Sequence, residues 1–394
     1  MPTSTPDIEA PSSARRRGWL LLIGVVLLSL LLLMIGGIAL AWPWIEDARL
    51  RAHLRELRAE INYEQIEEPT AHGGMRERQV IRWLQLSHDA IRKADFTKLE
   101  KLNHLESLDI YESHLDGELC QRIARLHSLE SVLIVDSYLA SDALGPLATL
   151  PSLDTLYLAE VKFEDETAFA ALANTPQLRW VSLAESNVTD VGGQVLGRLT
   201  TLESVSLDNT RIGDATLQEL KQLPRLKWLS VSSTAITDEG IAHLASCTAM
   251  ERLNVSDTAL TGRTLGELQT LTNLILLSLA KTHIADEHAA QLPELTSVTT
   301  LDLSETPLTD AVVVHLVQMP QLEMLKLDGT ALTDAGLAQL VQMPQLRQLH
   351  VEQTQVTAAA ANQVREQYPH LSLHAPGNSA GYPPGFAYPG ASQP

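Results

Sequence analysis

A short apolar motif, Leu-x-Leu or a close variant of it, returns along this chain with a period of 24 residues. Its second apolar residue can be followed through twelve positions, and all but one of the steps are 24 residues long: Leu86, Ile110, Ile134, Leu158, Leu183, Leu207, Val231, Val255, Leu279, Leu303, Leu327 and Val351. The single step of 25 places an extra residue near 165–169, and a truncated thirteenth copy follows at 368–373. One unit of this length cannot bury its own apolar face, so neighbouring units must stack. The repeats therefore predict one continuous solenoid over this part of the chain.

Each unit follows the pattern L-x-x-L-x-L-x-x-T-x-[IL]-T-D-x-x-L-x-x-L-x-x-L-P-x, and residues 325–344 are a clean copy of most of it. The Leu-x-Leu part alternates with period two, which is typical of a half-buried strand. Further along the unit, apolar residues such as Leu337, Leu340 and Met343 recur at every third position. That spacing predicts one buried face of a short helix or 3₁₀ turn.

These repeats resemble those of the leucine-rich-repeat family over about residues 81–373. They are most similar to a 24-residue class with Thr-Asp after the turn, which occurs in bacterial proteins and in adaptor-type repeats. The resemblance implies an α/β solenoid shaped as a horseshoe, with a parallel sheet on the concave side and short helices on the convex side. This sequence departs from the commonest pattern because Thr, not Asn, follows the strand.

Two polar columns accompany the repeat. Hydroxyl residues fill the turn position, where we expect them to bond backbone groups of their own and the neighbouring coil: Ser113, Ser137, Ser186, Thr210, Thr234, Thr258, Thr282, Thr306, Thr330 and Thr354. An aspartate column precedes the helical face, where it is expected to cap the helix start: Asp165, Asp190, Asp214, Asp238, Asp286, Asp310 and Asp334. A metal-binding ladder is the alternative, disfavoured because each unit offers one carboxylate and Gly262 and Ala358 interrupt the column.

The two cysteines, Cys120 and Cys247, fall in apolar columns of the repeat, five units apart. At about 4.8 Å per stacked strand they lie roughly 24 Å from each other, too far for a disulfide. We therefore expect both to fill the core.

An uncharged apolar stretch precedes the repeats. It runs from Trp19 to Trp42 and predicts a transmembrane helix over residues 18–42, because 24 residues of helix cover about 36 Å. A cleaved signal peptide and a twin-arginine signal are the alternatives. Arg15, Arg16 and Arg17 favour a cytoplasmic segment 1–17 and an extracytoplasmic solenoid, although arginines that follow the span nearly balance them. Residues 1–17 are rich in Pro and Ser, which predicts disorder.

The segments that flank the solenoid have their own signatures. Leu50, Leu54, Leu57 and Ile61 predict an amphipathic stalk helix or linker over residues 43–75, in front of a solenoid at 76–374. An interfacial helix and a short coiled-coil seam remain alternatives. Residues 375–394 are rich in Gly and Pro, which predicts disorder.

The net charge and the catalytic motifs that the sequence lacks argue against several classes of function. A net charge of −19 argues against a nucleic-acid partner and favours basic ones. The sequence contains no H-E-x-x-H, P-loop or G-x-S-x-G motif, and predicts no enzyme, no cofactor and no metal site. Carboxylates that assemble across neighbouring coils are the one route to catalysis that stays open.

In the horseshoe that the resemblance implies, the x positions of x-L-x-L-x-x face the concave surface, and they hold the candidate binding residues. Trp180 and Trp228 share one column with Ser204 between them, roughly 10 Å apart by strand spacing, and Tyr157 lies one unit earlier. Solvent-facing Trp and Tyr dominate interface energies, although they can also pack flat along neighbouring strands. Acids outnumber bases on this surface. The predicted partner-binding residues are Tyr111, Tyr157, Trp180, Trp228, Asp208, Asp257, Asp302 and Asp328.

The sequence thus favours a membrane-anchored recognition module that binds a protein or peptide, preferably a basic one, through its concave face. Two other functions remain open. One is a structural or spacer protein of the cell envelope, and the other is a cytoplasm-facing adaptor, although nothing in the sequence resembles an F-box.

Overall fold

The computed structural model describes residues 49–69, 75–88 and 90–376, and the chain divides into two units, Met1–Ala59 and Glu60–Pro394. Of the first unit, residues 49–56 are helical. None of the helices within the described ranges is long and apolar enough to cross a bilayer. The transmembrane helix predicted at 18–42 and the segment 1–17 lie outside the described residues, as do residues 377–394 of the Gly/Pro-rich segment.

The stalk helix predicted over residues 43–75 is wrong in its second half. The helix stops at residue 56, and Arg58 adopts a left-handed conformation with φ 54°, which ends a helix. Residues 60–69 form strand β1 (Glu60–Pro69), which pairs antiparallel with β2 (Met75–Ser87). From Ile61 onward, Ile and Tyr side chains favour a strand, so Ile61 belongs to this hairpin and not to the helix. The sheet of the second unit therefore begins near residue 60 instead of 76.

Across the described ranges of the second unit, 14 strands form one sheet, in the order β1-β2-β3-β5-β7-β9 and then β10 through β17. From β2 on, each strand pairs parallel with the next. Aligned residues are 24 positions apart, except that Thr155 of β7 aligns with Trp180 of β9. The strands are β3 (Ser107–Tyr111), β5 (Ser131–Val135), β7 (Thr155–Ala159), β9 (Trp180–Ser182), β10 (Ser204–Ser206), β11 (Trp228–Ser230), β12 (Arg252–Asn254), β13 (Leu276–Ser278), β14 (Thr300–Asp302), β15 (Met324–Lys326), β16 (Gln348–His350) and β17 (Ser372–His374).

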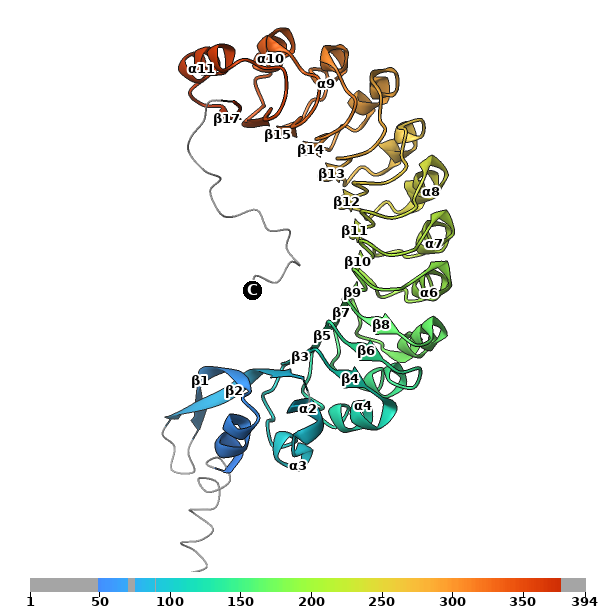
Figure 1. Ribbon diagram of the computed structural model, residues 1–394, viewed down its shortest axis with the longest axis vertical. Coiled ribbons are helices and arrows are strands. Elements are labelled where there is room, and N and C mark those ends of the chain that lie inside the picture. The colour runs from blue at the N-terminus through green and yellow to red at the C-terminus, as the bar shows by residue number, and fades with distance from the viewer. Residues whose placement is uncertain (1–48, 70–74, 89, 377–394) are drawn as a thin grey trace, which may run out of the picture. The chain divides into compact units, whose positions relative to one another are not determined.

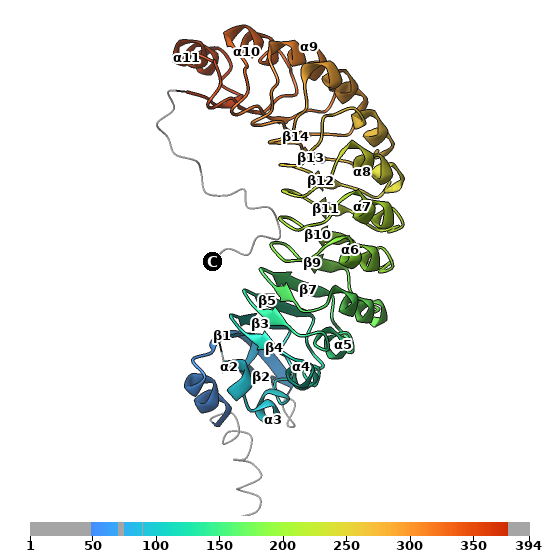
Figure 2. The same ribbon diagram turned by 45° about the vertical axis from the view of Figure 1, so that its right-hand side comes forward.

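Short helices lie on the opposite side of each coil from the sheet, as Figures 1 and 2 show for this unit. The sheet follows the inner side of the curve and the helices follow the outer side. They are α2 (Ala90–Lys93), α3 (Phe96–Leu99), α4 (Gly117–Ile123), α5 (Leu144–Leu147), η1 (Glu166–Asn174), α6 (Asp190–Leu196), α7 (Asp214–Leu220), α8 (Asp238–His243), η2 (Leu244–Ser246), η3 (Leu265–Thr270), η4 (Asp286–Glu294), η5 (Asp310–Val312), α9 (Val313–Leu316), α10 (Asp334–Leu340) and α11 (Ala358–Gln367). A solenoid with a concave parallel sheet and convex helices is therefore confirmed.

A small second sheet follows the first turns. It contains β4 (His114–Leu115), β6 (Tyr138–Leu139) and β8 (Lys162–Phe163). Its strands are parallel and again offset by 24 residues, as in the pair His114 and Tyr138.

The apolar columns of the repeat form the core between sheet and helices. Leu325, Leu327 and Leu340 are fully buried, and their counterparts in other units are equally enclosed. Each such side chain contributes roughly 1.5–3 kcal/mol through burial, so stacked units stabilise one another. Cys120 and Cys247 are free thiols buried in the same core, as predicted. Burial raises the pKa of Cys120 to about 12 and that of Cys247 to about 11.

A left-handed residue ends the concave segment of nearly every coil. Only one of these positions is Gly, namely Gly329, and the others are His88, Glu112, Asp136, Glu160, Glu185, Asn209, Ser233, Asp257, Lys281, Glu305 and Gln353. The turn hydroxyl directly follows the left-handed residue, and it donates a hydrogen bond to the carbonyl three residues before it. For Ser186 and the seven Thr residues of the column these bonds measure 2.5–2.7 Å. The predicted bond of each hydroxyl to its own coil is confirmed for these eight units.

The aspartate column joins neighbouring units, which corrects the expectation that it caps its own helices. Asp214 accepts bonds from the backbone amide and the hydroxyl of Thr237 in the next unit, at 2.8 and 2.6 Å. Thr237 in turn caps its own helix by accepting from the amide of Glu239. The Thr precedes the helix, whereas the Asp is its first residue and projects toward the following coil. The same Asp–Thr link recurs at Asp238–Thr261, Asp286–Thr309, Asp310–Thr333 and Asp334–Thr357.

Asp165 departs from this column. It caps its own helix by accepting from the amide of Thr167, and Glu166 takes the position that reaches Thr189 of the next unit. The extra residue of the 25-residue unit shifts the column by one at this point.

Candidate binding site on the concave sheet

The two tryptophans predicted to share a column do so. Ser204 of β10 aligns with Trp180 of β9 on one side and with Trp228 of β11 on the other. Trp180 is 41% exposed and Trp228 is half-buried, whereas Ser204 between them is only 3% exposed. The indoles therefore rise from the sheet on either side of a small residue. Both indoles therefore stay accessible to solvent and do not pack flat against the sheet.

A second column forms the floor beside the indoles. Tyr157 of β7 aligns with Ser182 of β9, and the column continues through Ser206, Ser230 and Asn254. Tyr157 thus lies one unit before Trp180, as predicted, but in the neighbouring column. The serines are nearly buried although they face the concave side. Small residues between large aromatic ones produce a hollow on the sheet.

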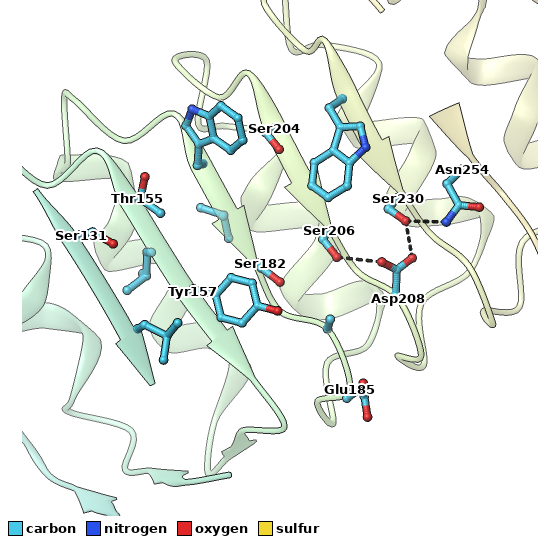
Figure 3. A pocket seen from close by; sticks show the side chains of 16 residues that line it. Ser131, Thr155, Tyr157, Ser182, Glu185, Ser204, Ser206, Asp208, Ser230 and Asn254 are labelled. Carbon is cyan, nitrogen blue, oxygen red and sulfur yellow. Dashed lines mark hydrogen bonds between the residues drawn. The ribbon is translucent and has the colours of Figure 1, made fainter. Parts of the chain in front are cut away.

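This hollow has a volume of about 390 Å³ and lies over β5, β7 and β9 to β12. Figure 3 shows Ser204 and Ser206 on the same strand, β10, with the phenol of Tyr157 pointing toward Ser182. The floor and rim also include Ser131, Thr155, Glu185 and Ala184. Burial raises the pKa of Tyr157, so its hydroxyl stays protonated and can donate a hydrogen bond at neutral pH. Together the lining offers aromatic faces and neutral hydroxyls.

Asp208 organises one wall of the hollow. One of its carboxylate oxygens accepts from the hydroxyls of Ser230 and Ser232 and from the amide of Ser232, at 2.5–2.7 Å, and the other accepts from Ser206 at 2.9 Å. Ser230 also accepts from the amide nitrogen of Asn254 at 3.0 Å (Figure 3). Both oxygens of the carboxylate are therefore occupied by hydrogen bonds from residues of the sheet and its turn. It positions serines across two strands and does not present a free charge to a partner.

The hollow brings together four of the eight predicted residues, Tyr157, Trp180, Trp228 and Asp208. Tyr111 lies on β3, two strands before β7, and Asp257 occupies a left-handed turn where it accepts from the hydroxyl of Ser233. These two positions are outside the lining.

Asp302 and Asp328 belong to a separate polar group on β14 to β17. The ammonium of Lys326 lies 3.3 Å from Asp302, and the imidazole of His350 stacks on that of His374 with ring centroids 4.2 Å apart. Burial raises the pKa of Asp328 to about 6 and lowers that of His350 to about 4. The structure therefore splits the predicted acidic residues among three places instead of gathering them at one site.

Sequence reasoning missed the serine floor. Ser182, Ser206 and Ser230 occupy the same position in three consecutive units, and Asn254 follows them in the fourth. A run of small polar residues in one concave column, next to two tryptophans in the adjacent column, was the available signal. Its meaning depends on which columns are adjacent, and only the strand register shows this.

For metals, the described part of the chain holds no group of three or more His, Cys, Asp or Glu side chains that could bind an ion. The hollow itself supplies two carboxylates, Asp208 and Glu185, of which Asp208 is fully engaged. Its chemistry is that of binding by stacking and neutral hydrogen bonds.

Comparison with solved structures identifies the fold. An internalin (inlF) from Listeria monocytogenes matches with a TM-score of 0.55 and 22% identity, over 76% of this chain and 87% of the internalin. The fold is a leucine-rich-repeat solenoid. The leucine-rich-repeat ectodomain of the plant membrane receptor kinase GASSHO1/SCHENGEN3 from Arabidopsis thaliana, in complex with CASPARIAN STRIP INTEGRITY FACTOR 2, matches at 21% identity over 70% of this chain and 33% of its own, with a TM-score of 0.46. A leucine-rich-repeat protein of Leptospira interrogans matches at 16% identity over 70% and 91%, with a TM-score of 0.43. No family model and no curated protein matches the sequence.

Proposed function

We propose that this leucine-rich-repeat solenoid is a recognition module that binds a peptide or an extended segment of a protein in the hollow between Trp180 and Trp228. The observation that carries this proposal is the pair of raised indoles on either side of Ser204, above a floor of serines. Exposed aromatic side chains next to a partly apolar pocket are the usual anchors of protein interfaces.

The preferred ligand is neutral at the hollow itself, which revises the expectation of a basic partner for this part of the surface. Asp208 already accepts four hydrogen bonds, and Glu185 is an exposed carboxylate of the rim. A basic residue that reached the hollow would find one free carboxylate. The protein's charge of −19 still favours basic partners over longer range.

Further features of the proposal come from the sequence. The chain is a leucine-rich-repeat protein of the 24-residue Thr-Asp type and of bacterial origin, held at a membrane by residues 18–42, with its solenoid outside the cytoplasm. It acts without catalysis and without a cofactor. Support comes from the uncharged stretch at 19–42 and from the 24-residue register of the strands.

The test is a selection of random twelve-residue peptides on the full-length chain in lipid nanodiscs, followed by titration calorimetry. We expect the variant with both Trp180→Ala and Trp228→Ala to bind the selected peptides at least about 30-fold more weakly, because aromatic anchors each contribute roughly 2 kcal/mol or more. Val314→Ala, an exposed apolar residue on α9, is the matched control and should leave the affinity unchanged.

Circular dichroism should show that both variants keep the fold. Two results would refute the proposal: a selection that yields no binding peptide, or peptides whose affinity survives loss of both indoles. A spacer of the cell envelope would give the first result.

A further inference from the structure

We propose, on the basis of the peptide-binding function above, that the hollow binds a segment of this same chain, residues 382–389. The segment reads Tyr-Pro-Pro-Gly-Phe-Ala-Tyr-Pro and follows the last strand of the solenoid. The binding site is then occupied by its own chain until an external ligand displaces that segment.

The spacing of the indoles fits a proline-rich peptide. Trp180 and Trp228 are two strand steps apart, which is about 9.6 Å at about 4.8 Å per strand. A polyproline II helix repeats every three residues with a rise of about 3.1 Å each, so residues i and i+3 lie about 9.3 Å apart on one side. A peptide in this form that crosses the strands can place one side chain against each indole. In the segment, Phe386 and Pro389 are such a pair.

The chemistry of the segment also matches the lining. Residues 376–394 contain no charged side chain, so docking them desolvates no ion. The chain has four Phe and seven Tyr, and three of these eleven, Tyr382, Phe386 and Tyr388, lie within seven residues of one another. Proline and aromatic rings stack on indoles, and grooves lined by aromatic residues are the common receptors of polyproline II peptides. Ser206 and Ser230 already donate to Asp208, so the hydroxyl of Tyr157 is the donor that the lining offers to a peptide carbonyl.

The length of the connecting chain allows this contact. The carbonyl of Ala375 accepts from the guanidinium of Arg365 at 3.1 Å, which fixes the start of the segment beside β17. Six strand steps separate β17 from β11, about 29 Å along the sheet. The eleven residues from Ala375 to Phe386 extend about 34 Å at about 3.1 Å each. Phe386 can therefore reach Trp228, and Pro389 can reach Trp180, without any change in the solenoid. A tether of this length gives an effective concentration in the millimolar range, so a weak contact suffices.

The test is disulfide trapping in the full-length chain. Arg252 is exposed and follows Trp228 in the same column, on the side toward β17. We expect Arg252→Cys combined with Gly385→Cys to form an intramolecular disulfide under mild oxidation with diamide, which accepts the two electrons and two protons of the thiols. Cys120 and Cys247 stay in place, because both are buried.

The control replaces Thr300 with Cys in place of Arg252, together with Gly385→Cys. Thr300 lies in the same column but two strands closer to β17. A segment without a preferred position would therefore meet Cys at 300 at least as often as Cys at 252. A docked segment should react at least about tenfold faster at 252. Adding Trp180→Ala and Trp228→Ala should remove this preference.

Three outcomes overturn the inference. The first is an equal or reversed preference between the two positions, and the second is a preference that persists without the indoles. The third is a disulfide formed only between chains in proportion to concentration, which would mean that the segment occupies a second copy. Selected peptides that bind through the indoles while trapping fails would leave the proposed function intact. Trapping without any binding of an external peptide would support the docked segment and refute the proposed binding of an external ligand.

Discussion

The early repeats, up to β8, and the late repeats, from β10 on, are joined to their neighbours by different hydrogen bonds just after the turn of each unit. Between β4, β6 and β8 each step is joined by two backbone bonds, for example from the amide of Tyr138 to Ser113 and from that of Ala140 to Leu115, both 2.9 Å. From β10 on, a step has at most one such bond, for example from Ala235 to Ile212 at 3.1 Å, and an Asp–Thr side-chain link is added in most units. The concave strands also differ, with five residues in β3, β5 and β7 and three from β9 on.

The change occurs within one coil, and the proposed binding site lies over it. The 25-residue unit, the last long strand β7 and the first short strand β9 all meet there. Tyr157 comes from the long strand and Trp180 from the short one. A break in an otherwise uniform repeat lets aromatic residues from two neighbouring columns face one hollow.

Asn187 bridges the two kinds of repeat, and its loss should have the largest effect on stability. Its side chain accepts from the amide of Phe163 at 2.8 Å and donates to the carbonyl of Phe163 at 3.0 Å, so it substitutes for a missing strand next to β8. Asn187→Ala leaves both backbone groups without these partners. We expect a loss of about 2–3 kcal/mol in the free energy of unfolding, measured by urea denaturation.

Asn273→Ala is the matched control. That amide makes one exposed bond, to the carbonyl of Thr248, and its removal should cost no more than about 0.5 kcal/mol. Equal losses for the two variants would show that Asn187 is not a structural junction.

The Asp–Thr link should make a smaller contribution. Asp214→Ala removes the acceptor for both the amide and the hydroxyl of Thr237, so we expect a loss of about 1–2 kcal/mol in the free energy of unfolding. Asp214→Asn keeps one acceptor oxygen and should cost less. A double-mutant cycle with Thr237→Ala isolates the pair, because Thr237 also caps its own helix. Additive effects would show that the link contributes nothing to the stacking.

These contrasts also show how far the sequence could predict the structure. The period of 24 predicted the solenoid, the buried cysteines and the shared column of Trp180 and Trp228, because these depend on phase alone. The parallel sheet was implied by the resemblance of the repeats to the leucine-rich-repeat family. Phase could not show that Asp214 accepts hydrogen bonds from the next unit, because a first-turn carboxylate can reach either its own helix or the next coil. It also could not predict the hairpin at β1 and β2, since that segment lies outside the repeat.

The binding residues were predicted in part for the same reason. Counting acids in single units placed Asp208 and Asp257 on one surface, but Asp257 occupies a left-handed turn beyond the strand and Asp208 is held by serines of the next unit. Such bonds between units depend on side-chain direction, which a repeat pattern does not contain.

The smallest predicted difference concerns the order in which the two kinds of repeat open, and the two cysteines report it. Cys120 lies in α4 among the early repeats, and Cys247 follows η2 among the late ones. Burial and a raised pKa protect both thiols in the folded chain, so alkylation requires local unfolding. Because stability in a solenoid is nearly a sum over neighbouring units, the late repeats, in which a partly exposed side-chain link replaces the second backbone bond, should open first.

We therefore expect iodoacetamide pulses in a urea series, read by mass spectrometry, to label Cys247 roughly threefold faster than Cys120 just below the unfolding midpoint, as expected for a difference of about 0.6 kcal/mol in local opening. Asp214→Ala should widen this ratio, because it weakens a link one unit before Cys247 and leaves the early repeats unchanged. Simultaneous labelling of both cysteines in both proteins would mean that the solenoid unfolds as one unit. The backbone and side-chain links would then be equivalent in free energy as well as in position.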